Sequence, residues 1–107
     1  MCGLNGLVRL AGGPPLDSAE LDRTCAAQAR RGPDGHGSWL APSGDCALAH
    51  RRLAILDLSD AGAQPMTSAD GRYTALLNGE IYNFRELSRE LAAKGVRLRS
   101  QSDTEVV

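Results

Sequence analysis

Glycine- and proline-rich turns divide this chain into short apolar runs, so its fold has to be built from short strands and helices. The apolar residues of Leu4–Leu10 stop abruptly at Ala11–Pro15, which predicts a strand followed by a turn. Asp17 is a good helix N-cap, and the apolar spacing after it predicts a helix over Ser18–Arg30. Gly32-Pro33 must end that helix.

The remaining runs predict further strands and one secure helix. Ser38–Leu40 and Cys46–His50 flank a turn and together indicate a hairpin, and Tyr73–Leu77 has the composition of a strand. Apolar side chains at helical spacing predict a helix from Asn83 to Lys94. The alternation in Val96–Arg99 is typical of a half-exposed strand.

Ser102 and Glu105 have the spacing of a capping box, which signals the start of another helix. Only two residues follow it, and one turn of helix is far too short to be stable alone. We therefore expect residues 1–107 to be the first part of a longer protein, with one domain at most.

Composition excludes several classes of function. Twelve basic residues are scattered among 13 acidic ones, so the chain has no basic surface for a nucleic acid. No apolar run has the length of a membrane span or a signal peptide, and we expect a cytoplasmic protein. The cysteines are odd in number and lack CxxC spacing, which argues against a metal site or a disulfide framework.

Cys2 directly follows the initiator methionine. If Met1 is removed, this one residue carries both a thiol and a free α-amine, a nucleophile and a base on one backbone. The two group types titrate close together in model peptides, so moving a proton from sulfur to nitrogen costs only ~1 kcal/mol. Cysteine at position 2 has no meaning by itself in most chains, and its interpretation depends on the motifs that follow.

Asn78-Gly79 allows two interpretations. Asn-Gly between apolar runs is a strong hairpin signal, and it then joins Leu77 to Ile81 by a two-residue turn. Alternatively, the Asn78 amide and the Gly79 N–H both donate to a carbonyl oxygen as it becomes an oxyanion. In that case Glu80 is a neighbouring anion able to hold a substrate ammonium group.

Arg51 and Arg52 are neighbours in a predicted strand, so their side chains point to opposite faces. One guanidinium can reach a pocket and fix a substrate carboxylate, while the other meets solvent. His50 is more consistent with a structural role, because an N-terminal amine makes a histidine base unnecessary. Asp103 lies beside the last helix start and could face a ligand cation.

The order of these motifs resembles the glutaminase domain of glutamine-hydrolysing asparagine synthetases, a class II amidotransferase domain among the N-terminal nucleophile hydrolases. The motifs are Met1–Gly3, Arg31–Gly35, His50–Leu53, Gly62–Met66, Asn78–Asn83 and Ser102–Glu105. The resemblance covers the whole chain. It implies an α+β fold, a four-layer αββα sandwich of two antiparallel sheets, of which residues 1–107 supply the first part.

The resemblance also implies site roles. Cys2 attacks the side-chain amide of glutamine to give a glutamyl thioester and ammonia, and Asn78 and Gly79 hold the oxyanion. Arg52 binds the glutamine α-carboxylate, and the remaining groups surround its α-amino group or line the same pocket. They are Glu80, Asp103, and the backbone of Leu53 and Ile55.

In the family, a C-terminal synthetase domain uses ATP and Mg²⁺ to convert aspartate to asparagine with the ammonia; the sequence predicts no cofactor or metal site in residues 1–107. A homo-oligomer is compatible with this assignment. Two alternatives stay open: the glutaminase domain of another class II amidotransferase or asparagine-synthetase-like amide-forming enzyme, and an inactive remnant or non-enzymatic interaction domain. The presence of Cys2 argues against relatives that make β-lactams.

Overall fold

A computed structural model describes residues 1–107 and contains seven helices and strands together with two 3₁₀ turns. In chain order they are β1 (Gly3–Val8), α1 (Ser18–Ala27), β2 (Gly35–Leu40), β3 (Cys46–Arg52), η1 (Asp60–Gly62), β4 (Met66–Thr67), β5 (Thr74–Ala75), α2 (Phe84–Ala93) and η2 (Asp103–Val106). Strands β1, β3 and β2 form one antiparallel sheet in that spatial order, and β4 pairs with β5 in a second. Neither helix is long and apolar enough to cross a membrane.

The core lies between α1 and the central strand β3. Leu21 and Cys25 of the helix pack on Ala47 and Ala49, and these four residues are the buried apolar cluster. Alanine at alternate positions of β3 leaves room for the helix to approach the sheet closely. Asp17 begins α1 as expected, because its carboxylate accepts a hydrogen bond from the Ala19 N–H at 2.9 Å.

Helix α1 ends at Ala27, three residues before the expected Arg30. From Gln28 onward the backbone bonds shorten to the i→i−3 type, with Gln28 N–H on Cys25 O and Ala29 N–H on Ala26 O. The predicted hairpin of β2 and β3 is confirmed, and both strands are longer than expected.

The strand expected over Tyr73–Leu77 is reduced to Thr74–Ala75, because Leu77 bonds to a side chain instead of a neighbouring strand. The Leu77 N–H donates to Gln64 Oε1 at 2.6 Å, and Gln64 Nε2 donates to Leu77 O at 3.3 Å. Asn78-Gly79 forms a bend, and no hairpin joins Leu77 to Ile81. The hairpin interpretation is therefore wrong.

The C-terminal third forms one confirmed helix and one short turn. α2 matches the helix expected after Asn83, although the Asn83 side chain makes no capping bond. Val96–Arg99 is not a strand, because no strand lies beside it and the Glu105 carboxylate binds the Arg99 N–H. The helix start at Ser102 is realised as the 3₁₀ turn η2, with Ser102 Oγ accepting from Thr104 N–H.

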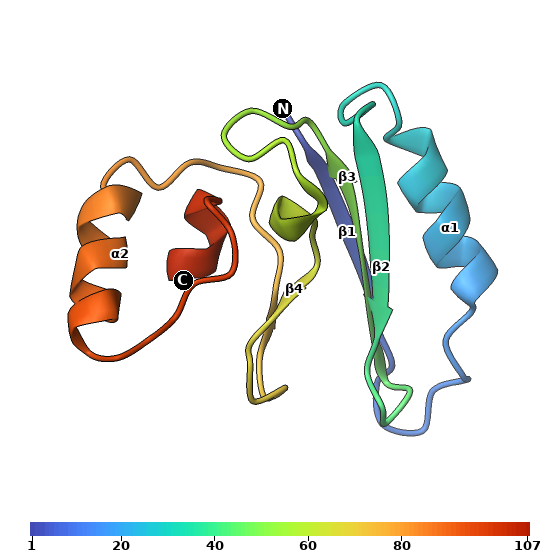
Figure 1. The fold of residues 1–107 in the computed structure, drawn as a ribbon. Coiled ribbons are helices and arrows are strands. Elements are labelled where there is room, and N and C mark those ends of the chain that lie inside the picture. Colours follow the sequence, from blue (N-terminus) through green and yellow to red (C-terminus); the bar gives the residue numbers. More distant parts are fainter.

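The elements lie in layers, with α1 on one face of the three-stranded sheet and β4, η2 and α2 beyond its other face (Figure 1). The first sheet directly contacts the segment that leads into β4, since a Cβ at Gly37 of β2 would overlap the carbonyl oxygen of Gln64. The chain is thus α+β with two antiparallel sheets between helices, as expected. This arrangement brings the start of β1 and the end of β3 toward the loops around η1 and η2.

Candidate functional site

A cavity of about 160 Å³ lies where β1 and β3 meet the loops of the second sheet. A cavity of this size accommodates a small organic molecule. All the residues that the sequence singled out for the site line it: Cys2, Arg52, Leu53, Ile55, Asn78, Gly79, Glu80 and Asp103. They come from four separate parts of the chain, so the fold gathers them into one place.

Cys2 is positioned by the pairing of β1 with β3. Gly3 pairs with Arg51 in the antiparallel register, which places Cys2 next to the residues that follow Arg51. The Leu53 N–H donates to Cys2 Sγ at 3.3 Å, and Sγ lies 3.7 Å from Leu53 O. Arg31 Nε donates to Cys2 O at 3.1 Å. The thiol is therefore held in place from both its side chain and its backbone.

The two arginines do point to opposite faces of β3. Arg52 lines the cavity, and its guanidinium donates to the carbonyl oxygens of Asp57 and Ser59, the latter at 2.7 Å. Arg51 is only partly exposed to solvent, because its Nε donates to Cys25 O at 3.0 Å on the helix side. Arg52 is thus the one cation of this pair that a ligand in the cavity can meet.

A second wall, formed by Asn78–Glu80 and Asp103, carries amide donors and carboxylates. Neither the Asn78 side chain nor the Gly79 N–H makes a hydrogen bond within the chain, and both residues are exposed. Asp103 is 7% exposed, and its carboxylate accepts from the Ile81 N–H at 2.8 Å. Glu80, also on this wall, is exposed. Arg52, the carboxylates of Glu80 and Asp103, and the two neutral donors therefore line the same cavity.

His50 is fully buried but does not line the cavity. Neither ring nitrogen has a hydrogen-bond partner. Burial lowers the pKa of His50 below the usual 6.5; the nearby Leu77 backbone opposes this shift and the charge of Arg52 adds to it. A neutral, enclosed imidazole fits the structural role expected for this residue.

Sequence reasoning gave no role to several cavity residues, among them Asp57, Gly62, Gln64 and Thr104. Gln64 links two loops of the site, because its Nε2 donates both to Leu77 O and to Thr104 Oγ1, the latter at 3.0 Å. Gly62 and Gln64 belong to a motif of the resemblance, which was a usable signal. Asp57 had only a weak one, the spacing Asp-Leu-Ser that favours a local side-chain turn. No group of three or more His, Cys, Asp or Glu side chains is arranged to hold a metal ion.

Comparisons with known proteins identify the family of the chain. The glutamine amidotransferase domain family matches residues 1–107. Glutamine-hydrolysing asparagine synthetase 3 of Bacillus subtilis is 36% identical over 109 residues, and the asparagine synthetase of Asparagus officinalis is 36% identical over 107 residues. Amidase chry2 of Gibberella zeae is 33% identical over 116 residues.

Each of these alignments covers 100% of this chain and 17% of the relative, so the chain spans about a sixth of their length. The expected resemblance is confirmed over the whole chain. The chain belongs to the glutamine amidotransferase domain family and corresponds to the glutamine amidotransferase part of glutamine-hydrolysing asparagine synthetases.

Proposed function

We propose that this chain hydrolyses glutamine to glutamate and ammonia, with Cys2 as the nucleophile and a glutamyl thioester as the intermediate. The observation that carries the proposal is that one cavity gathers a thiol, a guanidinium, the carboxylates of Glu80 and Asp103, and two free amide donors. A free amino acid with a side-chain amide is a ligand that matches these groups. Family membership supports the same substrate.

The substrate is held by charge complementarity. Arg52 binds the α-carboxylate, because its guanidinium is fixed by two carbonyl oxygens and keeps donors free for a ligand. Glu80 and Asp103 attract the α-ammonium group from the other wall. Backbone groups of Leu53 and Ile55 complete the lining. With both ends of the amino acid fixed, the side-chain amide is directed toward the thiol.

Cleavage of the Met1–Cys2 bond provides the base. Met1 itself lines the cavity, so its removal exposes the α-amine of Cys2 beside the substrate. That amine takes the thiol proton while Sγ bonds to the amide carbon of glutamine. The oxygen becomes an oxyanion, which accepts hydrogen bonds from Asn78 Nδ2 and Gly79 N–H at a gain of ~3 kcal/mol each.

The tetrahedral species then collapses to products. The α-ammonium group of Cys2 returns its proton to the amide nitrogen of glutamine. The C–N bond then breaks, ammonia departs, and the glutamyl thioester remains on Cys2. Water adds to the thioester carbon, with the α-amine taking its proton. The C–S bond breaks, sulfur recovers a proton, and glutamate departs. No proton or electron has to come from a cofactor.

The ammonia serves amide formation in a C-terminal synthetase domain. The asparagine synthetase relatives favour aspartate as the acceptor, activated there with ATP and Mg²⁺. The likeness to an amidase favours a second candidate, a glutaminase part that feeds another amide-forming reaction. Both candidates use the same chemistry in residues 1–107 and differ only in the acceptor.

A Cys2→Ala variant of the intact protein tests the proposal. We expect glutamate release from glutamine to fall at least about a thousandfold, while synthesis from added ammonia continues at the unaltered rate. Cys46→Ala is the matched control, since this partly buried cysteine of β3 lies outside the cavity. Unchanged glutamate release in Cys2→Ala excludes Cys2 as the nucleophile. Loss of both activities assigns the residue to folding.

A further inference from the structure

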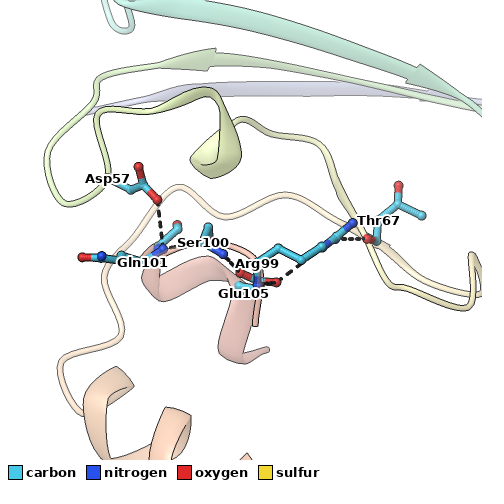
Figure 2. Close-up of polar contacts among 7 residues, drawn as sticks. Asp57, Thr67, Arg99, Ser100, Gln101 and Glu105 are labelled. Atoms are coloured by element: carbon cyan, nitrogen blue, oxygen red, sulfur yellow. Dashed lines mark hydrogen bonds and ion pairs between the residues drawn. The ribbon is translucent and has the colours of Figure 1, made fainter. Parts of the chain in front are cut away.

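The side chain of Asp57 joins two loops whose residues line the cavity. Its Oδ1 accepts from the backbone N–H and the hydroxyl of Ser59, at 2.8 and 2.6 Å. Its Oδ2 accepts from the Gln101 N–H at 2.9 Å, across 44 positions of sequence (Figure 2). One carboxylate therefore fixes both its own turn and a distant loop.

The turn at Asp57 also holds the guanidinium of Arg52. The carbonyl oxygens of Asp57 and Ser59 both accept from Arg52, one from each end of the turn. The bonds from the Ser59 N–H and hydroxyl to the Asp57 carboxylate keep these two carbonyl oxygens at a fixed spacing. Any change in the turn thus moves the cation that faces the cavity.

The loop that contains Gln101, the distant partner of Asp57, leads directly to Asp103. Glu105 fixes its first residues, since its carboxylate accepts from Arg99 N–H, Ser100 N–H and Ser100 Oγ at 2.7, 2.7 and 2.6 Å (Figure 2). Gln101 then bonds to Asp57, and Asp103 follows two residues later. The Asp57–Gln101 bond therefore ties the Asp103 wall to the Arg52 wall.

We propose that Asp57 is a positioning residue that sets the separation between Arg52 and Asp103, and through it the affinity for an α-amino acid. This inference rests on the proposed function, because it assigns the two walls to the carboxylate and ammonium groups of glutamine. Asp57 does not act on the scissile amide, so it affects binding of the substrate more than its turnover. Hydrogen bonds from the Ser59 hydroxyl, from Gln101 N–H and from Ser59 N–H lower the pKa of Asp57 to about 2, because they stabilise its ionised form.

Asp57→Asn in the intact protein tests this role. The amide has nearly the same shape but one oxygen fewer, so it cannot accept from both Ser59 and Gln101. We expect the KM for glutamine to rise about tenfold, equivalent to ~1.4 kcal/mol, with kcat reduced less than about twofold. Ammonia-dependent synthesis is expected to keep its rate. Ser59→Ala, which removes one of the three donors, raises KM about two- to threefold.

Asp70→Asn is the matched control. Asp70 has the same local pattern in the β4–β5 turn, accepting from Ser68 Oγ at 2.6 Å and Arg72 N–H at 3.1 Å, but lies outside the cavity. Its KM is expected to stay unchanged. A KM within twofold of the parent in Asp57→Asn overturns the inference, and so does a loss of kcat and ammonia-dependent synthesis with KM unaltered. Either result leaves the proposed role of Cys2 untouched, since the Cys2→Ala variant tests that role separately through glutamate release.

Discussion

Gly62 packs against the guanidinium of Arg52, and the methyl group of an alanine at this position displaces that guanidinium. A Cβ at Gly62 would overlap Arg52 Nη2 and would lie 3.1 Å from Asp57 Cβ and 3.2 Å from Arg52 Cζ. Gly62 is buried and its φ is not positive, so alanine suits the backbone and the clash is purely one of space. The flexible guanidinium is the group that yields.

The size of the effect follows from these contacts. Non-bonded atoms of this kind settle about 3.5 Å apart, so the guanidinium of Arg52 has to retreat by roughly 1 Å. That shift breaks at least one of its bonds to Asp57 O and Ser59 O, each worth about 1.5–3 kcal/mol as a charged hydrogen bond. Water replaces part of this loss at a half-exposed side chain. We expect about 1.4–2 kcal/mol less binding of glutamine, or a 10- to 30-fold lower kcat/KM.

The assay measures glutamate release and ammonia-dependent synthesis in parallel on Gly62→Ala. Gly35→Ala is the matched control, because its Cβ would lie 3.8 Å from Arg52 Cβ, an ordinary contact with the same residue. We expect the control to stay within about twofold of the parent. An unaltered kcat/KM for glutamine in Gly62→Ala, with the protein folded, refutes the role of Arg52 as the carboxylate clamp.

The remaining predictions concern stability. Because burial lowers the pKa of His50 below 6.5, the unfolded chain binds a proton at a higher pH than the native one, and the free energy of unfolding falls as the pH drops below 6.5. His50→Phe removes this contribution, so its unfolding temperature should decrease less between pH 7.5 and 5.5 than that of the parent; an equal decrease contradicts the assignment. Leu21→Ala deletes the largest side chain of a four-residue core and should cost about 2–4 kcal/mol, seen as a domain transition at least about 8 °C lower by calorimetry. A shift below 2 °C means that the core lies elsewhere.

Local signals predicted the elements whose bonds are local. The Asp17 cap and the spacing of Leu21 and Cys25 identified α1, because both depend only on nearby residues. The Asn78-Gly79 hairpin was wrong because distant side chains took its backbone partners: Gln64 bonds to Leu77, and Asp103 accepts from Ile81. A two-residue pattern cannot reveal acceptors that lie 13 and 22 positions away.

The site shows the same division. The alternation of side chains on a strand predicted that only one of Arg51 and Arg52 faces the cavity, and the structure agrees. The resemblance, and not the alternation, indicated that Arg52 is the arginine that faces the cavity. The resemblance also grouped Glu80 with Asp103. Asp57 had only the weak signal of its local turn, because its distant partner Gln101 is brought near only when the whole chain folds.

The most direct test of the account is the covalent state of Cys2 during turnover. The intact protein is mixed with glutamine, quenched in acid, digested and weighed by mass spectrometry. We predict a first peptide that starts at Cys2, lacks Met1 and carries one glutamyl group on sulfur, and we predict that hydroxylamine removes this group. A first peptide that retains Met1 and carries no glutamyl group, while glutamine is being consumed, would contradict the central claim that Cys2 is both nucleophile and base.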